Sequence, residues 1–383
     1  MLQPEREAMK GWRSLGGARN ARRRGRAVRG LAGVAVVTLS LVLAGCGGDS
    51  DSGSEVADGG WDAIVDAANK EGEVVFYSSD SDSINAAVIE AFEKEYPDIK
   101  VNLVKAGPDL AAQVATEKQS GINSGDVLST GFQDLVENKD WFLQLDDTVM
   151  PTLGEQTWPD NMVTDTWVAK YVQYLGVAWN TDVMDGEDLN TWADVLKPEF
   201  KGRLTLPDPR ATSTNISWLD AISNVLGDEY VEQVSALQPK IEAGGSVPAT
   251  QDVAAGAQDV SYPQSSMLVA DLSSKGAPIA FKVLTDPLIQ VPGQLAIFKE
   301  SPNPNAARVF ANFRVSPEGM SAVCIAAGPP GQTGFSAAFE EPVDGCYTAP
   351  EGEEVVQGDK NLTPEDERYL HIIGLLGLEP LTN

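Results

Sequence analysis

The segment VVFYSSDSDSINAAVIEAFEKEYPDIKVNLVKAG (Val74–Gly107) indicates the fold class of this chain. Its first residues form a short apolar run that ends in polar side chains, which is typical of a buried strand. Ile84, Val88 and Phe92 then recur at helical spacing, and Pro97 ends this helix. The alternation in IKVNLV indicates another strand. Strand, helix and strand in this order predict an α/β domain with a largely parallel sheet.

The alternation of helices and strands extends outward from this stretch. WDAIVDAANKEGE and DLAAQVATEKQS are predicted to be helices, and GDVLSTG is predicted to be a short strand. Ligands of such sheets bind beyond the carboxyl ends of the strands. The loops at 78–83, 106–109 and 129–132 should therefore lie near one site.

The second half of the chain continues the pattern. Strands are expected within VQYLGVAWNTDVM, at Arg203–Leu206, in PIAFKVL and in PGQLAIFK. Pro317 divides a pair of helices, and the final helix should begin with a Thr363 cap and Pro364 in its first turn. A chain of 383 residues with this pattern predicts two lobes.

The charge of the chain excludes one class of partner. The formal net charge is −28, although basic residues are concentrated before residue 30, so the remainder is still more acidic. Such a surface repels phosphate backbones. We therefore expect no nucleic-acid partner.

Residues 1–46 have the features of an export signal. A basic segment precedes the apolar run LAGVAVVTLSLVLA, which is too short to span a membrane. The run ends in LAGC, which resembles the lipobox of bacterial lipoproteins, so Cys46 is predicted to carry lipid and to become the mature N-terminus. The Gly-, Ser- and Asp-rich residues 47–61 are predicted to form a flexible linker. The protein should therefore lie outside the cytoplasm, anchored to the outer face of the cell membrane.

Two further cysteines remain, Cys324 and Cys346. An even pair in an exported protein favours a disulfide, and the alternative is two buried thiols.

The residues needed for common catalytic sites are missing from the sequence. His371 is the only histidine, and it lies within the terminal helix, where we expect it to pack. This excludes Ser-His-Asp and Cys-His arrangements and His-rich metal sites. Neither GxxxxGK[ST] nor GxSxG occurs. We expect capture of a solute rather than catalysis. The alternatives are an exported hydrolase that uses carboxylates and a tethered sensor partner.

Residues 62–383 resemble the extracellular solute-binding proteins of ABC importers, in the ferric-iron-binding class of periplasmic binding proteins. The resemblance is carried by GEVVFYSS, YLGVAWNTDVM, TWADVLKPEFKGRLTLPDPRATST and NPNAARVFANFRVSPEG, which occur in the expected order. It implies a two-lobed α/β fold of type II, with a ligand cleft between the lobes. Two hinge crossings would join the lobes, near 176–182 and 284–296.

The resemblance also implies a role and partners. The first lobe would comprise 62–177 and 297–383, and the second lobe with the hinge return would comprise 178–296. The protein would be a monomer that delivers a small solute to a permease with its ATPase. The ligand stays open between Fe(III) with a synergistic anion and an anionic or zwitterionic organic solute such as a phosphonate. We favour the organic solute and expect no other cofactor.

The loop DPRATSTN (Asp208–Asn215) is the first candidate for ligand binding. In relatives that bind iron, the matching loop holds an anion at a helix start. Free N–H groups there attract negative charge, and Arg210 would add a fork of donors. Thr212, Ser213 and Thr214 are therefore candidate ligand-binding residues. Alternatively, Thr212 or Ser213 only caps the helix.

Polar residues at the strand ends are further candidates. Ser78, Ser79 and Asp80 follow the first strand, and Thr130 ends the third. Relatives that bind iron can carry a histidine in the first of these loops, where this chain has Ser and Asp. Asp80 or Asp82 would face a cation or an amine, unless the loop only caps the next helix.

The segment DVSYPQSS (Asp259–Ser266) matches the place where ferric-binding relatives carry two adjacent tyrosines. Here Tyr262 is followed by Pro263, which should end the strand. We expect Tyr262 to point into the cleft with Gln264 nearby. It would bind Fe(III), or would stack on or hydrogen-bond an organic solute. The alternative is a tyrosine in a turn.

Overall fold

The computed structural model divides the chain into two compact units, residues 1–51 and 52–383. The residues that it describes are 55–105, 110–123, 125–130, 138–329 and 331–381. The predicted signal peptide, Cys46 and most of the predicted linker therefore lie outside the described residues. Within the described ranges, none of the helices has the length and apolar character that a membrane span requires.

The first sheet has the strand order β11-β4-β10-β3-β1-β2, and β12 pairs with β10. β2 and β3 run parallel to β1, whereas β10 runs antiparallel to β3 and β4. The predicted parallel arrangement around the opening stretch is confirmed, and antiparallel strands extend the sheet on one side. The strands are β1 (Glu73–Ser78), β2 (Lys100–Lys105), β3 (Val127–Thr130), β4 (Val168–Tyr174), β10 (Leu288–Ile297), β11 (Phe335–Ser336) and β12 (Val355–Val356).

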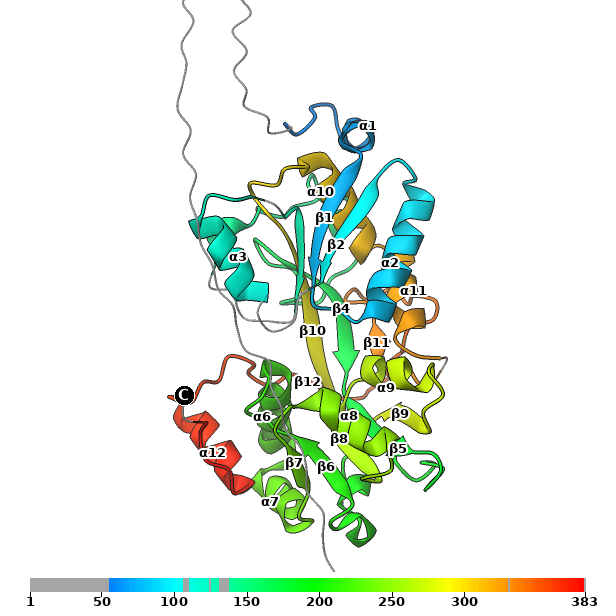
Figure 1. Cartoon of the computed structure of the whole chain (residues 1–383), viewed down its shortest axis with the longest axis vertical. Helices are drawn as coiled ribbons and strands as arrows, with labels where there is room; N and C mark the ends of the chain where they lie inside the picture. The colour runs from blue at the N-terminus through cyan, green and yellow to red at the C-terminus, as the bar shows by residue number, and fades with distance from the viewer. Residues whose placement is uncertain (1–54, 106–109, 124, 131–137, 330, 382–383) are drawn as a thin grey trace, which may run out of the picture. The chain divides into compact units, whose positions relative to one another are not determined.

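Helices cover both faces of this sheet because the side chains of β1 alternate. Phe76 packs with the helices of one face, and its neighbour Tyr77 packs with α3 (Leu110–Gln119) on the other. The first face is covered by α1 (Trp61–Glu71), α2 (Asp82–Glu95), α10 (Pro304–Val315) and α11 (Pro317–Ala326) (Figure 1). A short helix, α5 (Thr152–Glu155), lies between β3 and β4 in the chain. We call this sheet and these helices the first lobe.

The second sheet has the order β7-β6-β8-β5-β9. β6 runs parallel to β7 and β8, and β5 runs antiparallel to β8 and β9. We call this sheet and its helices the second lobe. Its elements are β5 (Gly176–Asn180), β6 (Leu204–Pro207), α6 (Ser213–Leu226), α7 (Asp228–Ala236), β7 (Lys240–Glu242), α8 (Ser246–Ala254), β8 (Val260–Gln264), α9 (Ser266–Ser273), β9 (Ile279–Val283) and α12 (Glu367–Leu375).

Strand β8 differs from the expectation because it continues through Pro263. Its pairing with β5 shifts register between Gly176, which faces Gln264, and Ala178, which faces Ser261. Pro263 lies inside this irregularity, where no ladder bond requires its missing N–H.

The two crossings between the lobes lie side by side. β4 ends at Tyr174 and β5 begins at Gly176, while β9 and β10 are joined by residues 284–287. The Leu175 N–H donates to the Ile289 carbonyl at 2.9 Å, and the Leu284 N–H donates to the Leu175 carbonyl at 3.4 Å. The return crossing is shorter than expected, because β10 already belongs to the first sheet from Leu288.

The C-terminal segment makes a further connection. Helix α12 packs on α6 and α7, since Tyr369, Ile372 and Ile373 belong to the core of the second lobe. The boundaries expected from the sequence place this helix with the first lobe instead. It also starts later than expected, because Asp366 is its N-cap and Thr363 donates to Asp366 rather than capping the helix.

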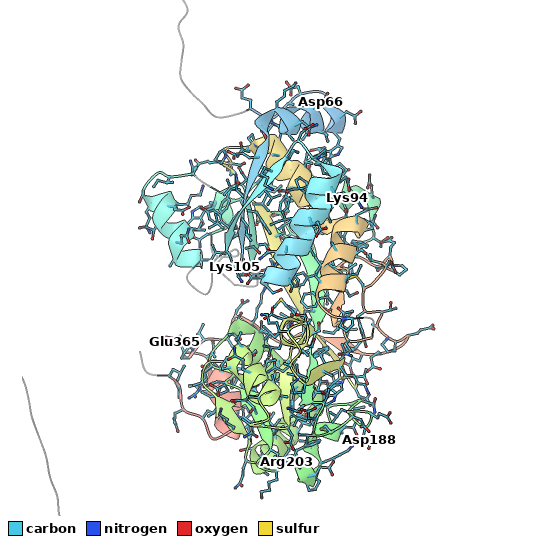
Figure 2. The ribbon with its side chains drawn as sticks, turned by 45° about the vertical axis from the view of Figure 1, so that its right-hand side comes forward. Asp66, Lys94, Lys105, Asp188, Arg203 and Glu365 are labelled. Atoms are coloured by element: carbon cyan, nitrogen blue, oxygen red, sulfur yellow. A yellow bond between two sulfur atoms is a disulfide. The ribbon has the colours of Figure 1, made fainter. Side chains whose placement is uncertain are left out.

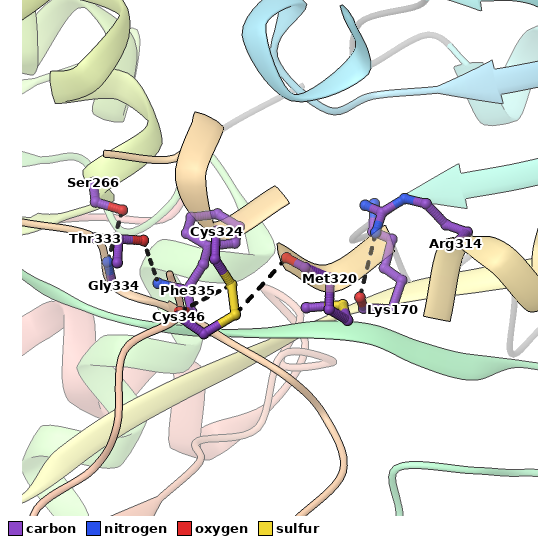
Figure 3. Close-up of a disulfide and its surroundings, with 9 residues drawn as sticks. All are labelled: Lys170, Ser266, Arg314, Met320, Cys324, Thr333, Gly334, Phe335 and Cys346. Atoms are coloured by element: carbon purple, nitrogen blue, oxygen red, sulfur yellow. Dashed lines mark hydrogen bonds between the residues drawn. A yellow bond between two sulfur atoms is a disulfide. The ribbon is translucent and has the colours of Figure 1, made fainter. Parts of the chain in front are cut away.

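Cys324 and Cys346 form a disulfide that closes a loop with a sequence separation of 22 (Figure 3). Cys324 lies near the end of α11, and Cys346 lies in the segment after β11. The bridge ties the start of the C-terminal segment to the helical layer of the first lobe.

Charged side chains lie on the outside of both lobes (Figure 2). Exposed examples are Asp66, Lys94, Lys105, Asp188, Arg203 and Glu365.

Candidate functional site

Residues of both lobes line a cavity of about 220 Å³. It lies where the strands of the first lobe meet the starts of helices in the second lobe. Its lining residues are Ser79, Asp80, Tyr171, Gln173, Val291, Pro292 and Gly293 from the first lobe, and Thr212, Ser213, Thr214, Ser246, Ser265, Met267 and Leu268 from the second. We call this cavity the cleft.

Three helices of the second lobe begin at the cleft. Thr212 is the N-cap of α6, Ser246 is the first residue of α8, and Ser265 is the N-cap of α9. The N–H groups of a first helical turn have no intrahelical acceptors, and the helix dipole makes this end positive. The three helix starts therefore provide backbone donors and a positive potential at one place.

The Thr212 side chain performs one local task in this arrangement. It accepts a hydrogen bond from the Asn215 N–H at 3.2 Å, as an N-cap does. Ser246 donates to the Asn215 side chain at 3.1 Å, which fixes the start of α8 beside that of α6. Capping and a position at the cleft thus both apply to Thr212.

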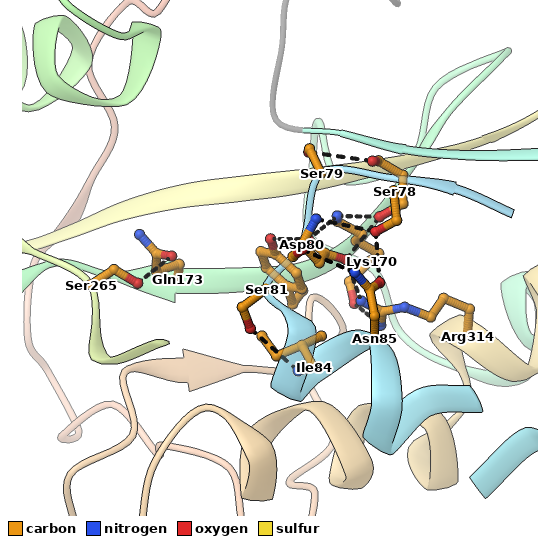
Figure 4. Close-up of polar contacts among 12 residues, drawn as sticks. Ser78, Ser79, Asp80, Ser81, Ile84, Asn85, Lys170, Gln173, Ser265 and Arg314 are labelled. Carbon is orange, nitrogen blue, oxygen red and sulfur yellow. Dashed lines mark hydrogen bonds and ion pairs between the residues drawn. The ribbon is translucent and has the colours of Figure 1, made fainter. Parts of the chain in front are cut away.

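A cluster of buried charges lies below the first-lobe side of the cleft (Figure 4). The Asp80 carboxylate accepts hydrogen bonds from Lys170 at 2.6 Å and from Arg314 at 3.3 Å. Tyr171 and Ser129 each donate to the same carboxylate at 2.9 Å. Lys170 also donates to Ser129. We call Asp80, Lys170 and Arg314 the charge cluster.

The charge cluster holds one carboxylate between two cations. Burial would raise the pKa of Asp80, but Lys170 and Arg314 outweigh burial and hold this pKa far below its usual range. Burial lowers the pKa of Lys170 to about 8, since Asp80 only partly offsets burial and Arg314 repels the ammonium group. With all three groups ionised, the cluster carries one surplus positive charge.

One hydrogen bond joins the lobes directly at the cleft. The Ser265 hydroxyl donates to the side-chain oxygen of Gln173 at 2.9 Å, and both residues are buried (Figure 4). Ser265 therefore uses its side chain between the lobes instead of capping α9, for which it makes no side-chain bond.

The structure brings together five of the residues expected to bind ligand: Ser79, Asp80, Thr212, Ser213 and Thr214. All of them lie at strand ends or helix starts, where the sequence placed them.

Three other expected residues do not line the cleft. Ser78 is fully buried and donates to Asn85 at 2.7 Å, so it supports the start of α2. Gln264 is buried and hydrogen-bonds Thr250 and Ser261 inside the second lobe. Thr130 is also buried at the end of β3.

The expectation for Arg210 is corrected by its local partner. Its guanidinium donates to both carboxylate oxygens of Asp208, at 2.8 and 2.6 Å, and also to the Glu379 carbonyl at 2.5 Å. Arg210 does not line the cleft. Its fork of donors therefore holds the C-terminal segment against the loop before α6.

The expectation for Tyr262 is corrected by its burial. Its side chain is 0% exposed and packs between Trp192 and Trp218 in the core of the second lobe. Burial raises the pKa of Tyr262 far above its usual range. Side chains alternate between the two faces of a strand, and the side chain of Tyr262 is on the face of β8 that packs into the core. It does not point into the cleft.

Tyr171 is the tyrosine that does line the cleft. Its hydroxyl already donates to Asp80, and burial raises its pKa well above 10, with the Asp80 charge acting in the same direction. Tyr262 does not reach the cleft, and the Tyr171 hydroxyl is already bonded to Asp80, so neither tyrosine is placed to bind a ferric ion there. In the described part of the chain, no group of three or more His, Cys, Asp or Glu side chains could hold a metal ion.

Sequence patterns gave little sign of the remaining lining residues. Gln173 and Tyr171 lie on a strand with no polar end that would single them out, and Ser265 looks like an ordinary helix cap. Their place at the cleft comes from the pairing of β4 with β10 and from the approach of the two lobes.

A second hollow of about 790 Å³ lies on the first lobe, beside Lys139, Asp140, Asp165, Trp167 and Lys299. Its lysines and aspartates are exposed and balance in charge. No α-helix of the described residues begins there; the only helical turn at this hollow is a short 3-10 helix, Lys139–Trp141. The smaller cleft combines helix starts, buried charge and both lobes, so we take it as the candidate functional site.

A family model described as bacterial extracellular solute-binding protein matches residues 77–321. No curated protein matches the chain at a comparable level.

Solved structures of binding proteins have a similar fold. A substrate-binding protein of an ABC transporter from Agrobacterium tumefaciens has 17% identity and a TM-score of 0.60, covering 79% of this chain and 93% of its own. AfuA from Actinobacillus pleuropneumoniae, with fructose-6-phosphate bound, has 20% identity and a TM-score of 0.57, covering 76% and 92%. Iron-bound HitA from Pseudomonas aeruginosa has 19% identity and a TM-score of 0.53, covering 80% and 98%. The predicted two-lobed α/β fold is confirmed.

Proposed function

The chain belongs to the family of bacterial extracellular solute-binding proteins, and on this premise we propose that it captures a small organic anion in the cleft and delivers it to the permease of an ABC importer. The family consists of solute-binding proteins rather than enzymes, which agrees with the missing catalytic residues. Its members act outside the cytoplasm.

The convergence of three helix starts on the cleft carries the proposal of an anion. α6, α8 and α9 each begin at the cleft, where the N–H groups of a first turn have no intrahelical acceptor, although Thr212 takes the Asn215 N–H and Pro248 has none. Asp80 is the carboxylate at the cleft, and the two cations of the charge cluster neutralise it. The electrostatics of the described lining therefore favour negative charge.

The remaining lining supports an organic body for the ligand. Met267, Leu268, Val291 and Pro292 are apolar, and Tyr171 contributes an aromatic ring. A cavity of about 220 Å³ is smaller than the range of ~300–1,000 Å³ that is usual for drug-sized ligands. The solute should therefore be a small metabolite. The fructose-6-phosphate bound to the similar protein AfuA has this chemistry.

A zwitterionic solute, which the sequence left open, would need an acidic side chain to bind its amine, and the two candidates are already paired. Both oxygens of Asp80 already accept hydrogen bonds from residues of this chain. Asp82 pairs with Lys105, and its side chain is 80% exposed. We therefore propose an anion that needs no carboxylate partner.

Ferric iron is the second candidate, because the similar protein HitA binds iron. The environments of Tyr171 and Tyr262 argue against it. A ferric ion would require several phenolate or carboxylate ligands, whereas the described lining offers only Tyr171 and Asp80, and these two already bond each other.

The proposal includes a cellular setting. Cys46 would carry the lipid that anchors the protein to the outer face of the membrane. The protein would act as a monomer, with a permease and an ATPase as partners. Neighbouring genes for both components would support this setting.

A thermal-shift panel tests the ligand class on the purified protein. The panel contains fructose-6-phosphate, phosphonates, carboxylates, polyamines, citrate and ferric citrate. A ligand at a hundredfold excess over its dissociation constant adds about 2.7 kcal/mol, or about 4 °C for a chain of this size. We expect a phosphate, phosphonate or carboxylate to give this shift. A shift from polyamines, or from ferric citrate but not from citrate, contradicts the proposal.

Thr214→Asp provides a matched test at the start of α6. A carboxylate in a first helical turn stabilises the helix by about 0.3–1 kcal/mol, so the unliganded protein should not lose stability. The same carboxylate should weaken anion binding at least tenfold. Thr214→Asn is the neutral control and should bind nearly as the wild type does. Unchanged anion affinity in Thr214→Asp contradicts the site.

A further inference from the structure

The charge cluster differs from an ordinary buried ion pair because its charges do not balance. Lys170 and Arg314 are both 0% exposed, and they share the single carboxylate of Asp80. Buried charges are usually paired, since an unpaired ion loses its hydration without compensation. A surplus cation in this place is costly to the fold and therefore calls for a functional reason.

Two further observations show that the surplus is not satisfied internally. Arg314 Nε is buried and has no hydrogen-bond partner among the described residues. Both cations also lie over the ring of Tyr171, with Lys170 Nζ at 4.7 Å and Arg314 Cζ at 5.8 Å from the ring centroid. The Tyr171 ring attracts both cations but adds no negative charge, and its hydroxyl stays protonated beside Asp80.

The wall between the cluster and the cleft is thin. Gly293 lines the cleft, and a Cβ added to it would lie 2.7 Å from Lys170 Cε and 2.5 Å from Tyr171 Cε2. Any larger residue would fill this space. The stem of Lys170 therefore lies directly behind the cleft wall, where its charge acts through low-dielectric protein rather than through water.

We propose that Lys170 and Arg314 select the charge of the solute: their surplus positive charge, held behind Gly293 and Tyr171, favours anions in the cleft and rejects cations. This inference rests on the proposed function and assigns its charge preference to specific residues outside the cleft lining. The helix starts supply hydrogen-bond donors to the solute, whereas the charge cluster supplies a full positive charge that is buried and therefore little screened by water. Neither cation needs to touch the solute.

Charge-balancing variants test the inference with fructose-6-phosphate as the probe in isothermal titration. Lys170→Met leaves Asp80 and Arg314 as a balanced pair. It should weaken probe binding about tenfold, or about 1.4 kcal/mol. Adding Asp80→Asn to Lys170→Met restores one surplus positive charge. The double variant should recover to within about threefold of the wild-type affinity.

The rescue separates charge selection from support of the fold. A supporting role predicts that the double variant, which lacks two members of the cluster, binds no better than Lys170→Met. That result overturns the inference, and so does unchanged affinity in Lys170→Met. Arg314→Met, alone and with Asp80→Asn, repeats the comparison if Lys170→Met does not fold, which circular dichroism shows. If the wild type binds neither fructose-6-phosphate nor inorganic phosphate, the proposed function itself fails and the inference falls with it.

Discussion

Replacing Asp80 by asparagine removes the carboxylate of the charge cluster and leaves Lys170 and Arg314 buried without a counter-charge. Removing one partner of a buried ion pair costs about 3–5 kcal/mol. Asp80 accepts four hydrogen bonds in the folded protein, and asparagine keeps only one side-chain acceptor. We therefore expect Asp80→Asn to lower the free energy of unfolding by about 4 kcal/mol.

Asp82→Asn is the matched control, two residues further along the chain at the start of α2. Asp82 also forms an ion pair, with Lys105, but the side chains are 80% and 45% exposed. Exposed pairs contribute about 0–1 kcal/mol. Urea unfolding followed by circular dichroism measures both variants. With a slope near ~3 kcal/mol per molar urea, Asp80→Asn should shift the midpoint by about 1.3 M.

The pH dependence of the same measurement gives a second criterion. Lys170 and Arg314 hold the pKa of folded Asp80 far below the value of about 3.9 in the unfolded chain, against the opposing effect of burial. The unfolded state therefore binds more protons as the pH falls below about 4, and the stability contributed by Asp80 is lost there. The difference between the wild type and Asp80→Asn should shrink from pH 5 to pH 2.

Two results would refute the reasoning. One is a loss below about 1 kcal/mol in Asp80→Asn, similar to that in Asp82→Asn. The other is a stability difference between the wild type and Asp80→Asn that stays constant as the pH is lowered.

Three further predictions concern the C-terminal segment and the cleft. Replacing Cys324 and Cys346 by alanine opens a loop with a sequence separation of 22 and should lower the free energy of unfolding by about 3 kcal/mol. Reduction of the disulfide in the wild type should lower its melting temperature similarly. A melting temperature that reduction leaves unchanged would contradict this prediction. Gly358→Ala places a Cβ 1.9 Å from the Ser217 carbonyl oxygen on α6, so it should cost about 1–3 kcal/mol in chemical denaturation, whereas the Cβ of Gly374→Ala meets no atom within 4 Å outside its own helical turn, so this variant serves as the control. Affinity for fructose-6-phosphate should fall as the pH rises through about 8, because burial lowers the pKa of Lys170 to about 8 and Lys170 therefore loses its charge there. The phosphate does not change its charge in this range, since its second pKa is near ~6. The same pH titration of Lys170→Met should show no such fall in affinity.

Sequence periodicity predicted the residues of the cleft that lie at strand ends and helix starts. Ser79 and Asp80 follow a strand that the apolar run made visible, and Thr212 precedes a helix that periodicity made visible. Strand ends and helix starts are positions where the chain turns toward the ligand edge of an α/β sheet. These residues were therefore predictable without knowledge of any distant contact.

The same local patterns failed for Arg210 and Tyr262. Arg210 follows Asp208 by two residues, and this neighbour takes its donors. Tyr262 was placed in the right strand, but the direction of its side chain depends on which face of β8 meets Trp192 and Trp218. Neither partner of Tyr262 is near it in the sequence.

The α/β class, the two lobes, the order of most elements and the family resemblance could be read from the amino-acid sequence, because these depend on periodicity, capping and chain order. The charge cluster became visible only once the chain was folded. Asp80 meets Lys170 across 90 residues and Arg314 across 234 residues. The tertiary structure also placed α12 on the second lobe and removed Tyr262 from the cleft. The physical reason is that burial and pairing of charges depend on contacts between distant segments, and no local pattern records those contacts.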